Sequence, residues 1–421
     1  MVLVFDSGTT KTKAFLFGEK AELLAYASCP TRIMHKSPGI AEQRAYYWWN
    51  ALVKSAEELR RSVHWNKDSI SAIGISSQGG TYVPLGKGCN PLRPGITWLD
   101  NRAEKFSNRL NKKYGSDYFY KRTGHCLAGW SPPASWLWLG EKEPSLISKS
   151  HRLSFVADYL NFKLTGKFYL DATSAQMTCF YNIVKGCWDK EILDIAGLSE
   201  DNMPQVMPPC SAGGTVTEEA AKLLDIPAGI PVVAGGHDQY CASLGAGAVN
   251  KGDCLISCGT SWALLVMTQH PVFIKEAGWV PGRHLKEDRF GLMAAISNGG
   301  VVLDWMKKNL RIKETGIDTC GEIEVVTDFS ENKGAVRNIN LSTTGRDIYL
   351  AGMKALSAVL KKRLDEISGR IKIKRLLMVG GWTREKALPA MIEKCTGIKV
   401  ILPEVNEAAG RGAALLAIKR V

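Results

Sequence analysis

The sequence lacks the features of an exported or membrane-spanning protein. Its first residues, Met1–Asp6, contain neither a basic segment nor a long apolar stretch, so we expect no signal peptide. The longest notable uncharged run, residues 254–274, holds Ser, Thr, Gln and His side chains and is too polar for a membrane-spanning helix. These absences predict a cytoplasmic protein without a membrane partner.

Disulfides and structural zinc are not expected either. The chain has 11 cysteines, an odd number, and shows no export signal, which argues against a disulfide framework. Cys254 and Cys258 are four positions apart, but no second Cys or His pair occurs at zinc spacing. We therefore interpret the cysteines as small, buried apolar side chains.

Low-complexity segments and Pro- or Ser-rich linkers are also absent from the 421 residues. This length exceeds the roughly 250–300 residues at which a single core stops growing, so two domains are expected. The formal net charge of +13 raises the alternative of a nucleic-acid binder. The basic clusters at 361–363 and 372–375 form no continuous stripe and lack an aromatic ladder, so we expect no nucleic-acid partner.

Two segments share the pattern strand, Gly-Thr turn, strand. Apolar residues flank the turn at residues 6–10, and a second apolar pair of segments flanks the turn at 259–261. Superposing the two Gly-Thr pairs aligns the flanking strands, which suggests two related halves that each offer backbone N–H groups to an anion. Two ordinary β-turns are the alternative interpretation.

Glycines mark two further junctions. An apolar strand delivers Asp238 through Gly235 and Gly236 to the start of a helical stretch, where an Asp is either a helix N-cap or an accessible carboxylate. Gly380-Gly381 follows a second apolar strand near the end of the chain. We place the domain boundary at the first junction, which predicts domains 1–237 and 238–421.

The order and spacing of these motifs resemble the FGGY family of carbohydrate kinases, the sugar and polyol kinases of the actin-like ATPase superfamily. Other segments similar to family elements are Ala41–Gln43, Ile73–Gln78, Ile96–Arg102, Asp158–Leu160 and Gly235–Gln239. The resemblance implies an α/β fold of two actin-like (ribonuclease H-like) domains with a cleft between them. It covers nearly the whole chain.

The resemblance also implies roles for individual residues. Asp238 corresponds to the general base, and Asp6 together with Asp238 would hold Mg²⁺ through water. The substrate-binding positions are Gln78, Trp98, Asp100, Arg102 and Gln239. The nucleotide-binding positions are Asp6, Thr9, Thr10, Lys13, Gly259, Thr260, Gly380, Gly381 and Arg384.

The expected reaction is ATP-dependent phosphorylation of a hydroxyl of a small ketose, polyol or sugar acid. The alternative is a kinase-like protein that binds nucleotide or sugar without turnover, because residues 318–347 lack the family's usual Gly-Glu-Arg-x-Pro-like segment. Asp100 and Arg102 could instead form a structural ion pair. A homodimer is also expected from the family.

Overall fold

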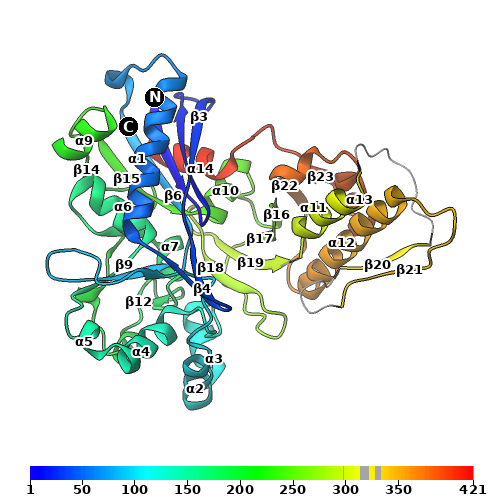
Figure 1. Ribbon diagram of the computed structural model, residues 1–421, viewed down its shortest axis with the longest axis horizontal. Helices are drawn as coiled ribbons and strands as arrows, with labels where there is room; N and C mark the ends of the chain where they lie inside the picture. The colour runs from blue at the N-terminus through cyan, green and yellow to red at the C-terminus, as the bar shows by residue number, and fades with distance from the viewer. Residues whose placement is uncertain (297, 313–321, 328–332, 421) are drawn as a thin grey trace. The chain divides into compact units, whose positions relative to one another are not determined.

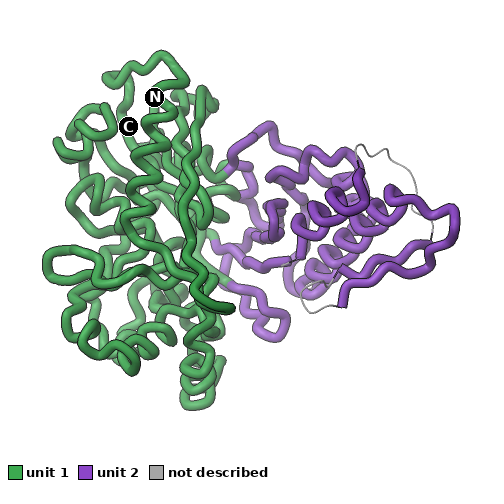
Figure 2. The backbone as a smooth tube through the Cα atoms, viewed as in Figure 1, with its two compact units in different colours: residues 1–245, 281–289, 409–421 green, residues 246–280, 290–408 purple. Residues whose placement is uncertain are grey.

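The computed structural model describes every residue except 297, 313–321, 328–332 and 421 (Figure 1). The chain forms two compact units, shown in Figure 2: residues 1–245, 281–289 and 409–421, and residues 246–280 and 290–408. In this grouping residues 238–245 fall in the first unit, and the functional division expected after residue 237 remains a prediction. Within the described residues, no helix combines the length and apolar character needed to cross a membrane.

The first unit alternates short strands with helices. Its strands are β1 (Val2–Ser7), β2 (Lys11–Phe17), β3 (Leu23–Pro30), β4 (Met34–Ser37), β5 (Ile40–Gln43), β6 (Ala72–Ser77), β7 (Tyr82–Leu85), β8 (Gly95–Ile96), β9 (Arg152–Phe155), β10 (Tyr169–Asp171), β11 (Tyr181–Asn182), β12 (Cys187–Trp188), β13 (Gln205–Met207), β14 (Ala212–Thr215) and β15 (Pro231–His237). Its helices are α1 (Ala45–Ser62), α2 (Glu104–Tyr114), α3 (Ser116–Thr123), α4 (Pro132–Lys142), α5 (Pro144–Ile147), α6 (Val156–Thr165), α7 (Ala172–Gln176), α8 (Lys190–Ile195), α9 (Glu218–Leu224), α10 (Asp238–Ala246) and α14 (Ala408–Ile418).

The central sheet of the first unit has the strand order β14-β15-β6-β1-β2-β3. β1, β6 and β15 run parallel, and the register places Ser7, Ser77 and His237 in one row across the three strands. Leu3 and Val4, adjacent residues of β1 that point to opposite faces of the sheet, are both fully buried, as expected for parallel strands that are covered on both faces. The three strands therefore end at the same edge of the sheet.

The C-terminal helix α14 returns to this sheet and packs through its small residues. A Cβ atom on Gly412 would lie 1.9 Å from the carbonyl oxygen of Cys241, and one on Gly410 would lie 2.8 Å from the ring of Phe15. On the opposing side, a Cβ on Gly74 of β6 would lie 2.7 Å from the carbonyl oxygen of Ala413. These approaches show that the small residues of α14 allow close packing against the sheet.

The second unit is built on a six-stranded mixed sheet with the order β18-β19-β17-β16-β22-β23, and β20 and β21 form a separate two-stranded sheet. Its core contains the fully buried residues Trp262, Trp279 and Tyr349. Its elements are β16 (Asp253–Cys258), β17 (Trp262–Thr268), β18 (Val280–Arg283), β19 (Phe290–Ile296), α11 (Gly300–Asn309), β20 (Glu324–Val326), β21 (Ala335–Arg337), α12 (Gly345–Ser368), β22 (Arg375–Val379), α13 (Ala387–Thr396) and β23 (Val400–Ile401). Residues 281–289, which include all of β18 except Val280, together with the turn that leads to β19, belong to the first unit.

The two sheets share one strand pattern. In the first, β1 pairs antiparallel with β2 and parallel with β6; in the second, β16 pairs antiparallel with β17 and parallel with β22. The orders β15-β6-β1-β2-β3 and β23-β22-β16-β17-β19 then correspond strand by strand. This correspondence confirms the predicted relation between the halves and the α/β fold class.

Asp158 caps the first turn of α6 from a fully buried position. Its carboxylate accepts hydrogen bonds from the Phe155 backbone N–H at 2.6 Å and from the Ser154 hydroxyl at 2.7 Å. Burial raises the pKa of this carboxyl from 3.8 to about 7, because desolvation outweighs the hydrogen bonds that favour its charged form. The folded state therefore binds the Asp158 proton more tightly than the unfolded state.

We predict that Asp158→Asn changes the pH dependence of stability. With the folded pKa above the unfolded value, the wild-type chain loses stability as pH rises from about 4 through 7, whereas the isosteric amide has no proton to lose. Melting temperatures measured from pH 4 to pH 8 should show the variant gaining on the wild type as pH rises. Parallel curves for the two proteins would contradict this assignment.

Candidate active site

The carboxyl edge of the first unit's parallel strands carries two acidic residues. Asp6 is the last residue but one of β1, and Asp238 opens α10 directly after β15. The Ser76 hydroxyl, on the strand between them, donates a 2.7 Å hydrogen bond to Asp6 Oδ1. The pKa of the nearby Cys241 thiol is raised by burial and further by the charges of Asp171, Asp6 and Asp238, which places both acids near one buried atom.

Asp238 is the first residue of α10, and its carboxylate is accessible. About 30% of its side chain is exposed, and its Oδ1 lies 3.5 Å from His237 Nε2. The backbone N–H of His237 donates to the Thr173 hydroxyl at 2.9 Å, which fixes the last residue of β15. Next in the chain, Gln239 is half-buried, and its Oε1 has no hydrogen-bond partner among the described residues.

The turn after β1 is closed by a 3.0 Å hydrogen bond from the Gly8 N–H to the carbonyl of Lys11. Thr10 is exposed at its tip, and Lys13 pairs with Asp6 in the β1–β2 register. The indole Nε1 of Trp98 donates to the Thr9 hydroxyl at 3.0 Å.

Trp98 is 43% exposed, which is unusual for a Trp and leaves part of its ring accessible to a ligand. Gln78, by contrast, is buried, and its amide bonds to the turn itself. The structure therefore brings together the predicted phosphate turn and two predicted sugar-side residues.

The pair Gly79-Gly80 follows Gln78 in a space too narrow for side chains. A Cβ on Gly79 would lie 2.6 Å from the Cβ of Met177 and 2.8 Å from the ring of His237. Gly80 has φ +72°, and a Cβ there would lie 3.2 Å from both Trp98 and Trp130. Met177 and Trp130 were not expected from the sequence, because no local pattern links them with the glycine pair.

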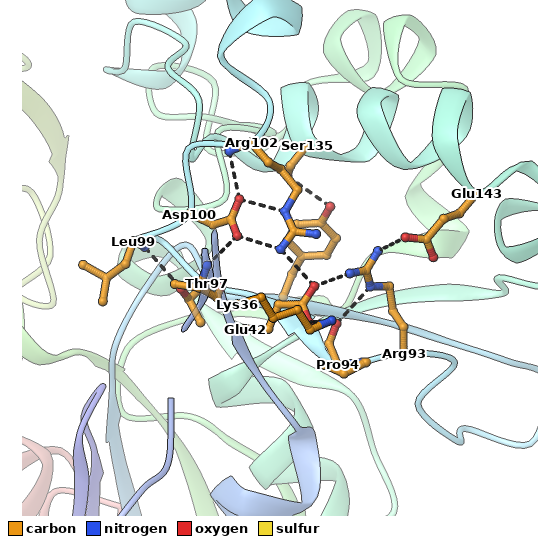
Figure 3. A network of polar contacts seen from close by, with 12 residues as sticks. Lys36, Glu42, Arg93, Pro94, Thr97, Leu99, Asp100, Arg102, Ser135 and Glu143 are labelled. Atoms are coloured by element: carbon orange, nitrogen blue, oxygen red, sulfur yellow. Dashed lines mark hydrogen bonds and ion pairs between the residues drawn. The ribbon is translucent and has the colours of Figure 1, made fainter. Parts of the chain in front are cut away.

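Asp100 and Arg102 form a buried ion pair, shown in Figure 3. Asp100 Oδ1 accepts from the Arg102 backbone N–H at 2.9 Å and from its Nε at 2.8 Å, while Oδ2 accepts from Arg102 Nη2 at 2.7 Å. The Ala41 N–H also donates to Oδ2, at 2.8 Å. These contacts match the structural ion pair that was the alternative to a direct sugar contact.

Glu42 lies at the centre of the same network and is fully buried. It forms ion pairs with Lys36, Arg93 and Arg102. Burial alone raises the pKa of Glu42, but the hydrogen bond from Lys36 and the charges of both arginines together hold it below its ordinary value. Glu42 therefore stays ionised and joins β5 to the loop that carries Trp98.

We predict that Arg102→Met destabilises the chain by about 3–5 kcal/mol, because Asp100 and Glu42 would remain buried without this partner. Arg61→Met is the matched control: Arg61 is 65% exposed and pairs with Glu57 and Glu58 on α1, so its loss should cost less than about 1 kcal/mol. Urea denaturation measures both. Equal losses of stability would show that the buried network does not stabilise the fold.

The second unit presents its own glycine turns at the ends of two parallel strands. Gly259 and Thr260 follow β16 and are exposed, and the carbonyl of Thr260 accepts from the Val301 N–H at 2.9 Å. Gly380 follows the parallel strand β22 with φ +101°, where a Cβ would lie 2.5 Å from the carbonyl oxygen of Cys258. Only a glycine fits this approach.

The residues after this turn differ in exposure. Gly381 and Arg384 are exposed, whereas Trp382 is packed in the core of the second unit. The predicted nucleotide-binding residues thus divide between the units, with Gly259, Thr260, Gly380, Gly381 and Arg384 in the second.

Comparison with family models decides the assignment. Residues 1–245 match the N-terminal domain model of the FGGY family of carbohydrate kinases, and residues 254–420 match its C-terminal domain model. The chain belongs to the FGGY family. It is accordingly a sugar or polyol kinase, and the family implies the use of ATP.

Curated relatives of this FGGY kinase act on different sugars. A gluconokinase of Bacillus licheniformis is 27% identical over 78% of this chain and 64% of its own length. A gluconokinase of Bacillus subtilis is 24% identical, and a xylulose kinase of Lactococcus lactis is 26% identical; each comparison covers 99% of this chain and 87% of the relative.

Solved structures agree in fold. A xylulose kinase from Brucella ovis has a TM-score of 0.92 at 22% identity, covering 100% of this chain and 90% of that one. A gluconate kinase from Lactobacillus acidophilus has a TM-score of 0.90 at 20% identity, covering 100% and 89%. The actin-like fold predicted from the sequence is confirmed.

Proposed function

We propose that this FGGY kinase transfers the γ-phosphoryl group of ATP to a hydroxyl of a small ketose, polyol or sugar acid, with Asp238 as the general base. The observation that carries the proposal is the shared end of β1, β6 and β15, where Asp6, near the end of β1, and Asp238, directly after β15, accompany a Gly-Thr turn. Relatives named gluconokinase, glycerol kinase and xylulose kinase support this range of acceptors.

Phosphoryl transfer requires little covalent chemistry from the protein. The γ-phosphate must be held in line with the attacking oxygen, and the acceptor hydroxyl must be oriented and lose its proton. The partly exposed carboxylate of Asp238 suits the second task, since it can accept a proton at an oxygen that solvent and substrate can reach. The neighbouring imidazole of His237 lies 3.5 Å from this carboxylate.

Each unit contributes residues to the proposed nucleotide contacts. In the first unit these are Thr9, Thr10 and Lys13, on and beside the turn after β1, with Lys13 adding positive charge. In the second unit Gly259 and Thr260 would contact phosphate, and Gly380, Gly381 and Arg384 would lie on the adenine side. Their exposed backbone at strand ends supports these roles.

Asp6 and Asp238 are the residues that would hold Mg²⁺, through water molecules. Carboxylate oxygens suit this ion, and Mg²⁺ keeps much of its hydration shell, so a cage of protein ligands is not required. When bound, the ion would neutralise charge on the phosphate oxygens. The hydrogen bond from Ser76 keeps the Asp6 carboxylate oriented for this role.

The five predicted substrate-binding residues divide by exposure. Trp98 and Gln239 have accessible surface, and we propose them as direct contacts to the sugar. Gln78, Asp100 and Arg102 are buried with their polar atoms bonded internally, and we propose that they support the site from behind. A cytoplasmic homodimer that does not bind nucleic acid stays our prediction.

We predict that Asp238→Asn lowers kcat by about 10²–10⁴-fold while nucleotide binding survives, because the amide cannot accept the proton of the hydroxyl. A coupled ADP-release assay over pentuloses, hexuloses, tetritols, glycerol and sugar acids first identifies the acceptor and then measures the variant. Asp68→Asn, at an exposed position away from the sheet edge, is the control and should keep wild-type turnover. Turnover of Asp238→Asn within a few-fold of wild type would refute the assignment.

The alternative is a kinase-like protein that binds nucleotide or sugar without turnover. It is motivated by residues 318–347, part of which lies outside the described residues. The same acceptor screen separates the two functions: stimulated ADP release with any acceptor establishes the kinase, and its absence across the panel establishes the alternative. Chelating divalent metal should abolish stimulated release, and added Mg²⁺ should restore it.

A further inference from the structure

The carbonyl groups of the turn after β1 are held from behind by two buried amides. Gln43 Nε2 donates to the Thr9 carbonyl at 2.7 Å, and Gln78 Nε2 donates to the Gly8 carbonyl at 3.3 Å. Gln78 Nε2 also donates to Gln43 Oε1 at 3.2 Å, so the two amides support each other. Neither side chain is more than 5% exposed.

The donor and acceptor of each hydrogen bond in this network can be assigned, because some of the groups can only donate and others can only accept. An indole N–H only donates and a backbone carbonyl only accepts. Trp48 Nε1 donates to Gln43 Oε1 at 3.0 Å, which turns Gln43 Nε2 toward the Thr9 carbonyl. The Gly8 carbonyl likewise requires Gln78 Nε2, which leaves Gln78 Oε1 as an acceptor.

Trp98, a proposed sugar contact, is hydrogen-bonded to the same network. Its indole Nε1 donates to the Thr9 hydroxyl, so the single hydroxyl proton of Thr9 goes to Gln78 Oε1, at 3.1 Å. A second path runs from the Trp98 backbone N–H to the Thr81 hydroxyl at 3.3 Å, and from that hydroxyl to Gln78 Oε1 at 3.2 Å. Both paths from Trp98 therefore end on the amide that holds the turn.

We propose that Gln43 and Gln78 are positioning residues for the first phosphate turn, and that the Trp98 indole N–H couples the sugar side of the site to this turn through the Thr9 hydroxyl. The inference rests on the proposed function, in which the turn binds phosphate and the Trp98 ring contacts the sugar. Gln78 then acts on the nucleotide through the backbone of Gly8 and Thr9. A sugar that shifts the indole changes the phosphate turn directly.

The distinguishing test measures nucleotide affinity in a variant on the sugar side. Trp98→Phe keeps an aromatic ring and removes the N–H, and should weaken binding of adenylyl imidodiphosphate with Mg²⁺ by about three- to tenfold, the range for loss of one hydrogen bond. Trp65→Phe is the matched control, since it removes an indole hydrogen bond to the Asp225 carbonyl at a different place in the unit. Isothermal titration calorimetry without any sugar gives both affinities.

A double-mutant cycle identifies the Thr9 hydroxyl as the link. Thr9→Val should weaken analogue binding, whereas Thr9→Ser, which keeps the hydroxyl, should bind the analogue as the wild type does. In the Thr9→Val background, Trp98→Phe should cause no further loss of analogue affinity. Additive losses would overturn the coupling. Gln78→Met tests the amide, and should raise the KM for ATP more than it lowers kcat; if this variant does not fold, the Thr9–Trp98 cycle still decides the coupling.

The outcome is separable from that of the proposed function. Unchanged analogue affinity in Trp98→Phe, in a chain that shows sugar-stimulated ADP release, overturns the inference and leaves the kinase intact. If Trp98→Phe weakens analogue binding as expected but the wild-type chain shows no sugar-stimulated ADP release, the inference is supported and the proposed turnover is overturned.

Discussion

Parallel pairing of β6 with β1 on one side and with β15 on the other is the constraint on which the first unit's chemistry depends. Because Ser7, Ser77 and His237 lie in one row across the three strands, the strand ends emerge at one edge of the sheet, with strand spacings of about 4.8 Å. A slip of one residue in the β1–β6 ladder would turn Asp6 toward the other face of the sheet. The second unit repeats this arrangement with β16 and β22, so one geometric rule places both glycine turns.

Charge near the site is used largely for structure. The buried carboxylates of Glu42 and Asp100 are paired with Lys36, Arg93 and Arg102 in a network behind the loop of Trp98, at the cost of desolvating several ions. The amides of Gln43 and Gln78 are similarly committed to hydrogen bonds within the protein, to backbone carbonyls through Nε2 and to side-chain donors through Oε1. The Asp238 carboxylate and part of the Trp98 ring stay accessible, whereas the polar groups buried behind them are already paired within the protein.

Features coded by local sequence could be predicted, and features that depend on distant contacts could not. The Gly-Thr turns, the strand before Asp238 and the relation between the halves follow from short apolar runs and glycine punctuation, and the sheets agree with them. By contrast, the residue type of Gln78 suited a sugar contact equally well, and only the fold shows its amide bonded to the Gly8 carbonyl. The space around Gly79 and Gly80 likewise depends on Trp130 and Met177, which no spacing rule connects to them.

The path of the chain also determines the order in which the protein can be completed during synthesis. Residues 409–421 complete the first unit, although the whole of the second unit's sequence precedes them. Until α14 leaves the ribosome, the surface of β6 and β2 around Gly74 and Phe15 has no helix to cover it. The first unit, begun earliest, therefore acquires its last element only after the sequence of the second unit has been synthesised.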